Sequence, residues 1–281
     1  MWPKRSFGIS TRLYQSQQLT REHLAEIGSA GFEAAELFAT RRHLDYHNPA
    51  VIGDLQQWLA AAGVELRSVH APVAEAVVGG RLDGPLNLAS ADAAARATAL
   101  AEAERALQIA RRIPFRVLVV HLGVPRSMTS GPIESTRDAA RRSIDALHQA
   151  AEPLGVRIAI EIIPNEFSQP GSIVHFIEHV IDAAGVGICL DVGHAHLDGD
   201  VVDAIETVSE HLLTVHLHDN HRRGDEHLLP FNGSIDWAAS LTALQKVSYD
   251  GTMMLEIGPQ GSTRDTLTAA KQVRQRMERY L

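Results

Sequence analysis

The sequence predicts an α/β fold, a single (β/α)8 TIM barrel. Eight apolar runs of strand length alternate along the chain with segments of helical periodicity. The runs are continuously apolar, which is typical of parallel strands covered on both faces. A length of 281 residues suits one barrel, and eight consecutive strand–helix units in a chain of this size favour that fold.

The first half of the chain supplies four of these units. Strands are expected over residues 6–10, 32–38, 64–70 and 115–121. Helices are expected over residues 20–31, 48–63, 90–112 and 134–152. The second helix has Asn48 as its N-cap and Pro49 at its first position, where the missing N–H of proline needs no partner. Residues 71–89 are expected to form a long loop, because Gly79-Gly80 and Gly84-Pro85 interrupt regular structure.

The second half supplies the other four units. Strands are expected over residues 156–163, 186–191, 212–218 and 252–257. Helices are expected over residues 172–184 and 201–209, after Asp236, and over residues 263–280. No linker is long or polar enough to divide the chain, so residues 1–281 are expected to form one domain. No Gly-x-Gly-x-x-Gly turn follows the first strand, which argues against a doubly wound open sheet.

Composition is that of an ordinary globular protein. Hydrophobic residues make up 45% and charged residues 21%, and the net charge is −8. Nucleic-acid affinity comes mainly from Lys and Arg, which Asp and Glu outnumber by 34 to 26. The single cysteine, Cys189, excludes an internal disulfide and fits a reducing compartment. No signal-peptide core and no run of about 20 apolar residues is present, so we expect a cytoplasmic protein without a membrane partner.

The ends of the predicted strands carry the chemistry. Six of the eight strands end in a side chain that can bind a metal: His70, His121, Glu161, Asp191, His216 and Glu256. His194 follows in a DVGH turn, and Asp225 and His227 come from the loop after the seventh strand. Residues at the C-terminal ends of barrel strands converge on one site. Four carboxylates in one cleft repel each other unless protons or a cation neutralise them. The sequence therefore predicts a bound divalent metal ion.

These segments resemble the xylose-isomerase-like TIM barrels. That superfamily includes sugar-phosphate isomerase/epimerase-type proteins and apurinic-site nucleases of the endonuclease IV type. The resemblance covers nearly the whole chain, through FGIST, SVHAP, VVHLG, IEIIP, CLDVGHAH, VHLHDN, DEHLLPFNGSIDW and LEIGP. The DEHLLPFNGSIDW segment looks most like the isomerase/epimerase-type branch.

Resemblance to the epimerases implies one divalent ion, Mn, Mg or Co, and Zn is a further candidate for this site. Its implied ligands are Glu161, Asp191, His216 and Glu256. Three oxygen donors and one nitrogen suit a hard or borderline ion. The resemblance also implies Glu161 and Glu256 as the catalytic acid/base pair, which moves a proton through a metal-chelated enediolate. Arg222 and His194 fall where epimerases contact their substrate.

Resemblance to the nucleases implies three zinc ions and nine ligands. The positions are His70, His121, Glu161, Asp191, His194, His216, Asp225, His227 and Glu256, and each holds a residue of the right type. The loop after His70, APVAEAVVGG, lacks the aromatic-plus-apolar wedge expected of an enzyme that flips a nucleotide. In a sugar enzyme, the additional residues could equally form a second metal site or contact substrate: His70, His121, His194, Asp225 and His227.

We expect a metal-dependent isomerase or epimerase that acts on a small carbohydrate: a sugar, keto-sugar or related polyol. A nucleic-acid partner is not expected, and a homodimer is an open option because barrels of this group often pair. The alternatives are a zinc-dependent apurinic-site endonuclease and a sugar lyase, dehydratase or hydrolase that uses the same metal site. A sugar-binding protein without activity is a further alternative.

Three other residues carry specific expectations. Glu36 ends the second strand and is expected to point into the barrel mouth and bind substrate hydroxyls, or to pair with an arginine. His218 shares a strand face with His216, because side chains alternate, and is expected to line the mouth. His43 is expected on the surface, with the other histidines of the helices and loops.

Overall fold

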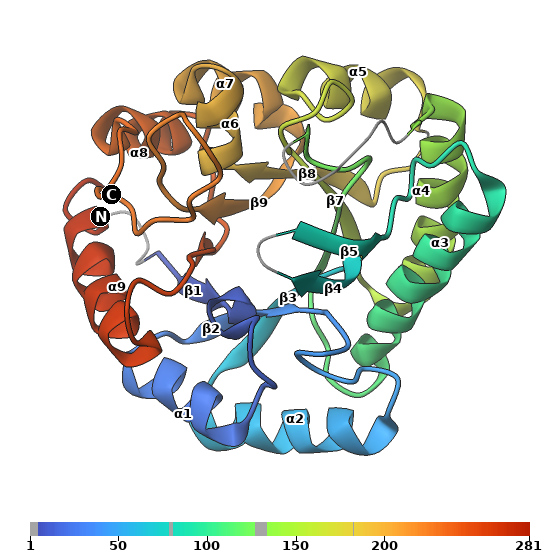
Figure 1. Cartoon of the computed structure of the whole chain (residues 1–281). Helices are drawn as coiled ribbons and strands as arrows, with labels where there is room; N and C mark the ends of the chain where they lie inside the picture. The colour runs from blue at the N-terminus through green and yellow to red at the C-terminus, as the bar shows by residue number, and fades with distance from the viewer. Residues whose placement is uncertain (1–4, 79–80, 127–133, 182) are drawn as a thin grey trace.

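A computed structural model of the chain describes residues 5–78, 81–126, 134–181 and 183–281. Eight parallel strands close into a barrel (Figure 1), in the order β1-β10-β9-β8-β7-β6-β3-β2. The strands are β1 (Phe7–Ser10), β2 (Ala34–Phe38), β3 (Glu65–His70), β6 (Val117–Val120), β7 (Arg157–Glu161), β8 (Val186–Asp191), β9 (Leu212–Leu217) and β10 (Met253–Leu255). Pairing of β1 with β10, with Phe7 opposite Met253, closes the ring. The expected TIM barrel is confirmed.

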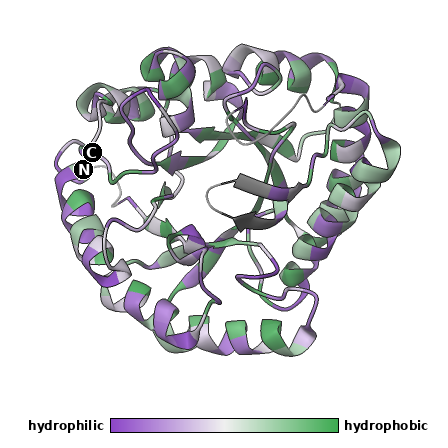
Figure 2. Ribbon diagram, in the orientation of Figure 1, coloured by the Kyte–Doolittle hydropathy of each residue, from purple (hydrophilic) through white to green (hydrophobic). Residues whose placement is uncertain are grey.

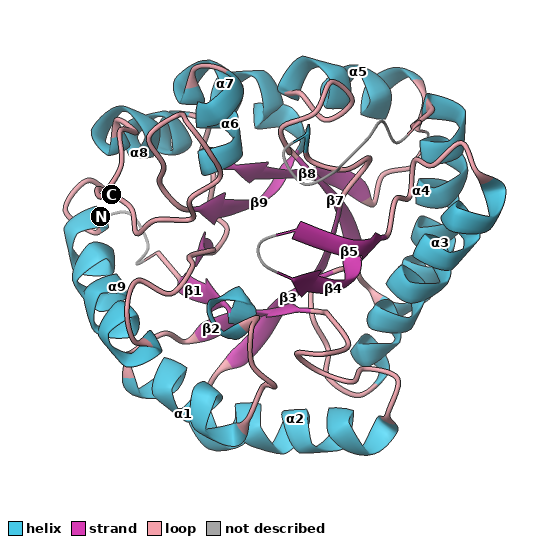
Figure 3. Ribbon diagram, viewed as in Figure 1, coloured by secondary structure: helices cyan, strands magenta, loops and turns pink. Residues whose placement is uncertain are grey.

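Helices surround the barrel on its outer side (Figure 3). The α-helices are α1 (Arg21–Ser29), α2 (Pro49–Ala62), α3 (Ala93–Leu107), α4 (Arg137–Ala151), α5 (Pro170–His179), α6 (Val192–Asp198), α7 (Val201–Val208), α8 (Trp237–Lys246) and α9 (Thr263–Met277). Short 3-10 helices are η1 (Thr11–Tyr14), η2 (Gln108–Arg111), η4 (Glu152–Leu154) and η5 (Ser209–His211). Helix α2 begins as expected, with the Asn48 side chain accepting from the Ala50 N–H.

The hydrophobic core has two parts, because successive strand residues point to opposite faces. The larger part packs the outer strand faces against the helices, for example through Leu118, Ile160 and Leu190. The smaller part fills the barrel interior and includes Val119 and Cys189. In Figure 2 hydrophobic residues predominate in the barrel strands, while the surrounding helices carry both hydrophobic and hydrophilic residues. In the described part of the chain, no helix is both long and apolar enough to cross a membrane.

The prediction that residues 71–89 form a loop is partly wrong. It contains an antiparallel pair, β4 (Ala74–Val78) and β5 (Arg81–Pro85), with Ala74 opposite Pro85. The pair projects across the barrel opening in Figure 1. Gly79 and Gly80 lie outside the described residues. Gly84, the other expected breaker, lies within β5 with φ of +63°. Glycine adopts this left-handed backbone without steric strain, so the strand continues through Gly84.

Two further expectations need correction. The DVGH segment is not a turn but the start of α6, whose N-cap Asp191 accepts from the His194 N–H at 2.7 Å. His43 is not a surface residue, since it is fully buried and its Nδ1–H donates to the Gln17 carbonyl at 2.8 Å. Tertiary packing over a loop buried this histidine, and no local pattern in the sequence reports such packing.

Candidate metal centre

The C-terminal ends of the barrel strands bring the expected ligands together. His70, Glu161 and Asp191 are the last residues of β3, β7 and β8. The others lie at or just beyond the ends of their strands: His216 on β9, His121 after β6 and Glu256 after β10. Because all eight strands run in parallel, these side chains open at one end of the barrel.

The inner set consists of Glu161, Asp191, His216 and Glu256. All four residues are buried, and one ligand atom from each lies within 4.8 Å of the others. Nδ1 of His216 lies 3.2 Å from a Glu161 oxygen, 3.7 Å from a Glu256 oxygen and 4.0 Å from an Asp191 oxygen. One imidazole nitrogen therefore faces three carboxylates, a donor set that suits a hard or borderline divalent ion.

Glu36 lies beneath the inner set and does not line the cleft. Its Oε2 accepts from Nε2–H of His216 at 3.0 Å and from the Ser68 hydroxyl at 2.8 Å. Burial alone would raise the pKa of Glu36, but His216 outweighs it and lowers the pKa. An ionised carboxylate only accepts, so Nε2 of His216 carries a proton, and Nδ1 is the nitrogen that would bind a metal in place of a second proton.

Glu161 joins the inner set to two further histidines. Its Oε2 lies 2.9 Å from Nε2 of His70 and 2.8 Å from Nε2 of His121, while Oε1 faces His216. Burial would raise the pKa of this carboxyl, but the imidazoles around it hold the pKa well below its usual range. The three residues Glu161, His70 and His121 also form a group whose ligand atoms lie within 4.8 Å of one another.

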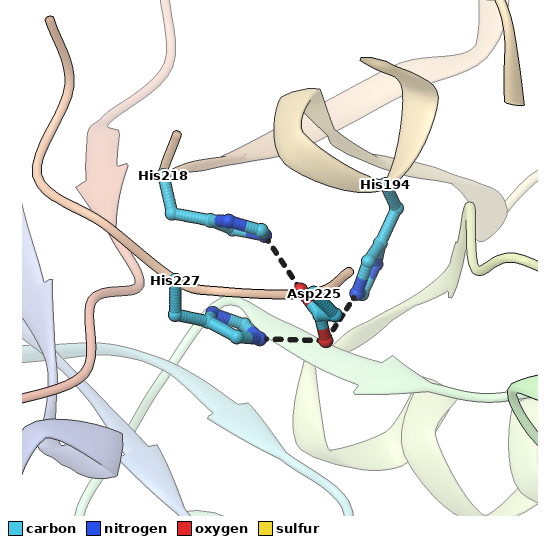
Figure 4. A group of neighbouring side chains, drawn as sticks. All are labelled: His194, His218, Asp225 and His227. Atoms are coloured by element: carbon cyan, nitrogen blue, oxygen red, sulfur yellow. Dashed lines mark hydrogen bonds and ion pairs between the residues drawn. The ribbon is translucent and has the colours of Figure 1, made fainter. Parts of the chain in front are cut away.

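The outer set consists of His194, His218, Asp225 and His227 (Figure 4), again with ligand atoms within 4.8 Å of one another. Asp225 Oδ2 lies 3.2 Å from Nε2 of His194 and 3.0 Å from Nε2 of His227. Its Oδ1 is buried without a hydrogen bond among the described residues, 3.8 Å from Nε2 of His218. His218 is thus a metal candidate that the sequence analysis does not include, although its spacing from His216 places both on one strand face.

The hydrogen bonds of three imidazoles fit a bound cation. In His70, His194 and His227, Nδ1–H donates to a backbone carbonyl at 2.8–3.0 Å. The Nε2 of each then points at a carboxylate oxygen. A neutral imidazole has only one N–H, so Nε2 presents a lone pair to an anion unless the ring is protonated. A divalent ion between the nitrogen and the carboxylate removes that conflict, and a backbone bond at Nδ1 is the usual support of a metal-binding histidine.

A folded-back loop after β9 carries three residues of the outer set, His218, Asp225 and His227, while His194 lies on α6. Asp219 and Leu228 exchange backbone hydrogen bonds of 2.8 and 2.9 Å. The Asp219 carboxylate also accepts from the Ile235 N–H and from the Trp237 indole N–H, at 3.2 and 2.8 Å. These bonds fix both ends of the loop. His227 has φ of +46°, a left-handed backbone that a non-glycine residue adopts only where its surroundings hold it.

His194 and Arg222, both expected to contact substrate, lie in different places relative to the cleft. His194 lines the cleft over the inner set, whereas Arg222 does not. Arg222 is exposed, and its guanidinium donates to the Gly199 carbonyl at 2.9 Å and to His196 at 3.3 Å. Besides the metal candidates, the cleft is lined by Arg12, Gln15, Phe38, Val73 and Pro125, none of which the sequence had singled out.

Comparison with known proteins agrees with this architecture. A family model described as the xylose isomerase-like TIM barrel matches residues 24–280. The uncharacterised protein MJ1311 of Methanocaldococcus jannaschii is 27% identical over 257 residues, which cover 89% of this chain and 83% of that protein. D-psicose 3-epimerase of Agrobacterium fabrum is 24% identical over 252 residues, which cover 83% of this chain and 78% of that enzyme.

A solved structure of a D-tagatose 3-epimerase-like protein matches with a TM-score of 0.78 and 26% identity. The match covers 98% of this chain and 96% of the other. Sugar epimerases are thus among the proteins that this chain resembles in sequence. With its closed barrel and a match over nearly its whole length, the chain belongs to the xylose isomerase-like TIM barrel family.

Proposed function

We propose that this protein is a metal-dependent isomerase or epimerase of a small carbohydrate: a sugar, keto-sugar or related polyol. The observation that carries the proposal is the inner set, in which Glu161, Asp191, Glu256 and the Nδ1 of His216 converge. Glu161 and Glu256 line the cleft, and Asp191 and His216 lie fully buried next to them. The similarity to psicose 3-epimerase supports sugar chemistry. Pairing of two chains into a homodimer stays a prediction.

The inner set would hold the ion, Mn, Mg, Co or Zn. A divalent ion there supplies Lewis-acid polarisation of a substrate carbonyl and its neighbouring hydroxyl, which acidifies the C–H between them. Asp191 and His216 serve as ligands, and Glu36 keeps the His216 ring in the tautomer that a ligand needs.

Glu161 and Glu256 are the proposed acid/base pair. The Glu256 carboxylate lines the cleft and accepts no hydrogen bond from the described residues, so it is available to take a proton from a substrate carbon. Glu161 also lines the cleft, but its Oε2 lies 2.9 Å from Nε2 of His70 and 2.8 Å from Nε2 of His121. The two carboxylates therefore differ in their hydrogen bonding, with Glu256 the free group that would take the proton and Glu161 its partner across the ion.

Proton exchange in heavy water tests the proposal. The manganese-loaded protein is incubated with a panel of ketoses in heavy water, and deuterium at the carbon next to the carbonyl is followed by NMR. We expect deuterium in at least one sugar, and incorporation slower by a factor of about 10²–10⁴ with Glu256→Gln. If the folded, metal-loaded protein exchanges no sugar proton, the proposed function is wrong. Exchange at the wild-type rate in Glu256→Gln contradicts the acid/base assignment alone.

A second candidate is a zinc-dependent nuclease of the apurinic-site type. It is favoured by the outer set and by the pair of His70 and His121, because all nine positions of that nuclease resemblance gather at this mouth. The net charge of −8 argues against a nucleic-acid substrate. Nicking of a duplex that contains an abasic site, abolished by a chelator, would favour this candidate over the isomerase.

A further inference from the structure

Arg12 is a half-buried arginine at the edge of the cleft, outside every group of metal candidates. It lies on η1, the short helix that directly follows β1, drawn in cyan near β2 in Figure 3. The other three residues of η1 are buried, and Thr11 Oγ1 accepts from the Phe38 N–H at 2.9 Å, which ties the helix to the end of β2. The backbone is therefore fixed while the Arg12 side chain faces the cleft.

The charge of Arg12 is not neutralised by the protein. Among the described residues, its guanidinium makes no ion pair and donates no hydrogen bond, in contrast to Arg126, which pairs with Asp198, and Arg222, which donates to Gly199. Arg12 lies next to Gly258, since a Cβ built on that glycine would be 4.0 Å from Nη1 of Arg12. The Gly258 N–H donates a hydrogen bond to the His227 carbonyl, so Arg12 lies near the outer set. The positive charge of Arg12 also acts on the outer set. Burial is the largest cause of the lowered pKa of His227, and the charge of Arg12 is the next.

Among the described residues that line the cleft, Arg12 is the only charged one outside the metal candidates; Gln15 is polar and neutral, and Phe38, Val73 and Pro125 are apolar. Sugar hydroxyls can pair with Gln15 and with the histidines and carboxylates of the metal candidates. A neutral hydroxyl, however, leaves the positive charge of Arg12 without a counter-ion. A guanidinium is instead matched to a carboxylate or phosphate, whose two oxygens it binds through paired N–H groups.

We propose that Arg12 binds an acidic group of the substrate, a carboxylate or a phosphate, and so selects an anionic keto-sugar. The keto-sugar part of this inference rests on the proposed function, whereas the acidic group rests on Arg12 itself. The substrate then lies between two anchors, with its carbonyl end over the inner set and its acidic end at η1. Arg12 is a specificity-determining residue in this arrangement and takes no part in the proton transfer.

Binding of small anions tests the role of Arg12 without any assumption about sugar stereochemistry. The melting temperature of the manganese-loaded protein is measured with inorganic phosphate, glycolate or chloride at equal ionic strength. We expect phosphate or glycolate to raise the melting temperature above that in chloride. The rise should disappear in Arg12→Gln, fall in Arg12→Lys and persist in the control Arg223→Gln, which changes an exposed arginine of the loop after β9. A rise that is equal in Arg12→Gln would place the anion at the metal and overturn the inference, as would no rise at all.

A matched set of ketoses distinguishes the two acidic groups. D-Fructose, D-fructuronate and D-fructose 6-phosphate differ only at carbon 6, and their dissociation constants are measured by calorimetry. We expect one of the acids to bind at least about tenfold more tightly than fructose, an advantage that Arg12→Gln removes. Preference for fructuronate identifies a carboxylate, and preference for the 6-phosphate identifies a phosphate. Binding of fructose as tight as that of both acids would overturn the inference.

The two proposals fail separately. Arg12-dependent anion binding without deuterium exchange in any ketose would leave the Arg12 site intact and refute the isomerase. Rapid exchange in neutral ketoses, with the Michaelis constant unchanged by Arg12→Gln, would leave the isomerase intact and refute the acidic substrate.

Discussion

His216 and Glu36 are joined by a fully buried hydrogen bond, with Nε2 of the imidazole 3.0 Å from Oε2 of the carboxylate. The two residues lie 180 positions apart in the sequence and meet only because the barrel closes. Their bond fixes the proton on Nε2, so that Nδ1 faces Glu161 at 3.2 Å as an available ligand. Glu36 thus orients a ligand of the metal candidate site from below.

Replacing Glu36 by glutamine should weaken metal binding. An amide can offer Nε2 either its oxygen or its N–H group, so the tautomer of His216 is no longer fixed, and second-sphere losses of this kind reduce metal affinity by about 10–100-fold. Equilibrium dialysis against manganese measures the change, with Glu33→Gln, an exposed position just before β2, as the control. Wild-type metal affinity with only a raised Michaelis constant would show instead that Glu36 contacts substrate.

Replacing Gly193 by alanine should disrupt the outer set. A Cβ at Gly193 would lie 2.0 Å from Cε1 of His218, so the ring or α6 must move. Overpacking of this kind costs about 1–3 kcal/mol of the free energy of unfolding. We expect that loss in urea denaturation, together with one metal ion fewer per chain.

Gly199 provides the matched control for that substitution. It ends the same helix, and a Cβ there would meet nothing within 4 Å. Gly199→Ala should therefore leave metal content and stability unchanged. Equal metal content in wild type and Gly193→Ala would show that the outer set holds no ion.

Buried His43 should make the protein less stable in mild acid. Burial lowers the pKa of His43 from 6.5 to about 4. Between these values the unfolded chain binds a proton at this position and the folded protein does not, so the free energy of unfolding falls as the pH falls. The His43 contribution is complete above pH 6.5 and shrinks by about 2 kcal/mol between pH 8 and pH 5.

His43→Asn isolates this contribution. The asparagine amide can still donate to the Gln17 carbonyl but does not titrate in this range. Urea denaturation at several pH values should show the stability difference between wild type and variant narrowing by about 2 kcal/mol from pH 8 to pH 5. A difference that stays constant over this range would mean that the folded protein accepts the proton at His43.

Replacing Glu256 by glutamine should slow proton exchange in the substrate. Loss of a general base typically costs a factor of about 10²–10⁴ in rate. The rate of deuterium incorporation is compared at saturating manganese, so that weaker metal binding does not limit it. A variant that retains more than about a tenth of the wild-type rate would remove Glu256 from the acid/base pair.

The barrel and most of the site were predictable because their signals are local. A strand that is apolar along its length and ends in His, Asp or Glu reports its own position at the barrel mouth, as LRSVH and IAIE do. The exceptions depend on contacts between distant parts of the chain. The sequence does not indicate that Glu36 bonds to His216 or that the guanidinium of Arg222 bonds to the Gly199 carbonyl.

Two residues show what local patterns miss. Arg12 belongs to a short helix directly after β1, and nothing near it in the sequence indicates that its side chain faces the metal candidates. His218 was expected at the mouth, yet its membership of the outer set depends on the fold of the loop that brings Asp225 and His227 over it. Both roles arise from loop geometry that the closed barrel supports.

Metal-dependent proton exchange is the most direct test of the central claim. The protein is stripped with a chelator, and deuterium incorporation into fructose, fructuronate and fructose 6-phosphate is followed in heavy water before and after manganese is restored. The proposed function predicts no exchange in the stripped protein, and exchange in at least one sugar after manganese is added, which Glu256→Gln slows by a factor of about 10²–10⁴. Exchange of equal rate in the stripped protein, or none after manganese is bound, would contradict it.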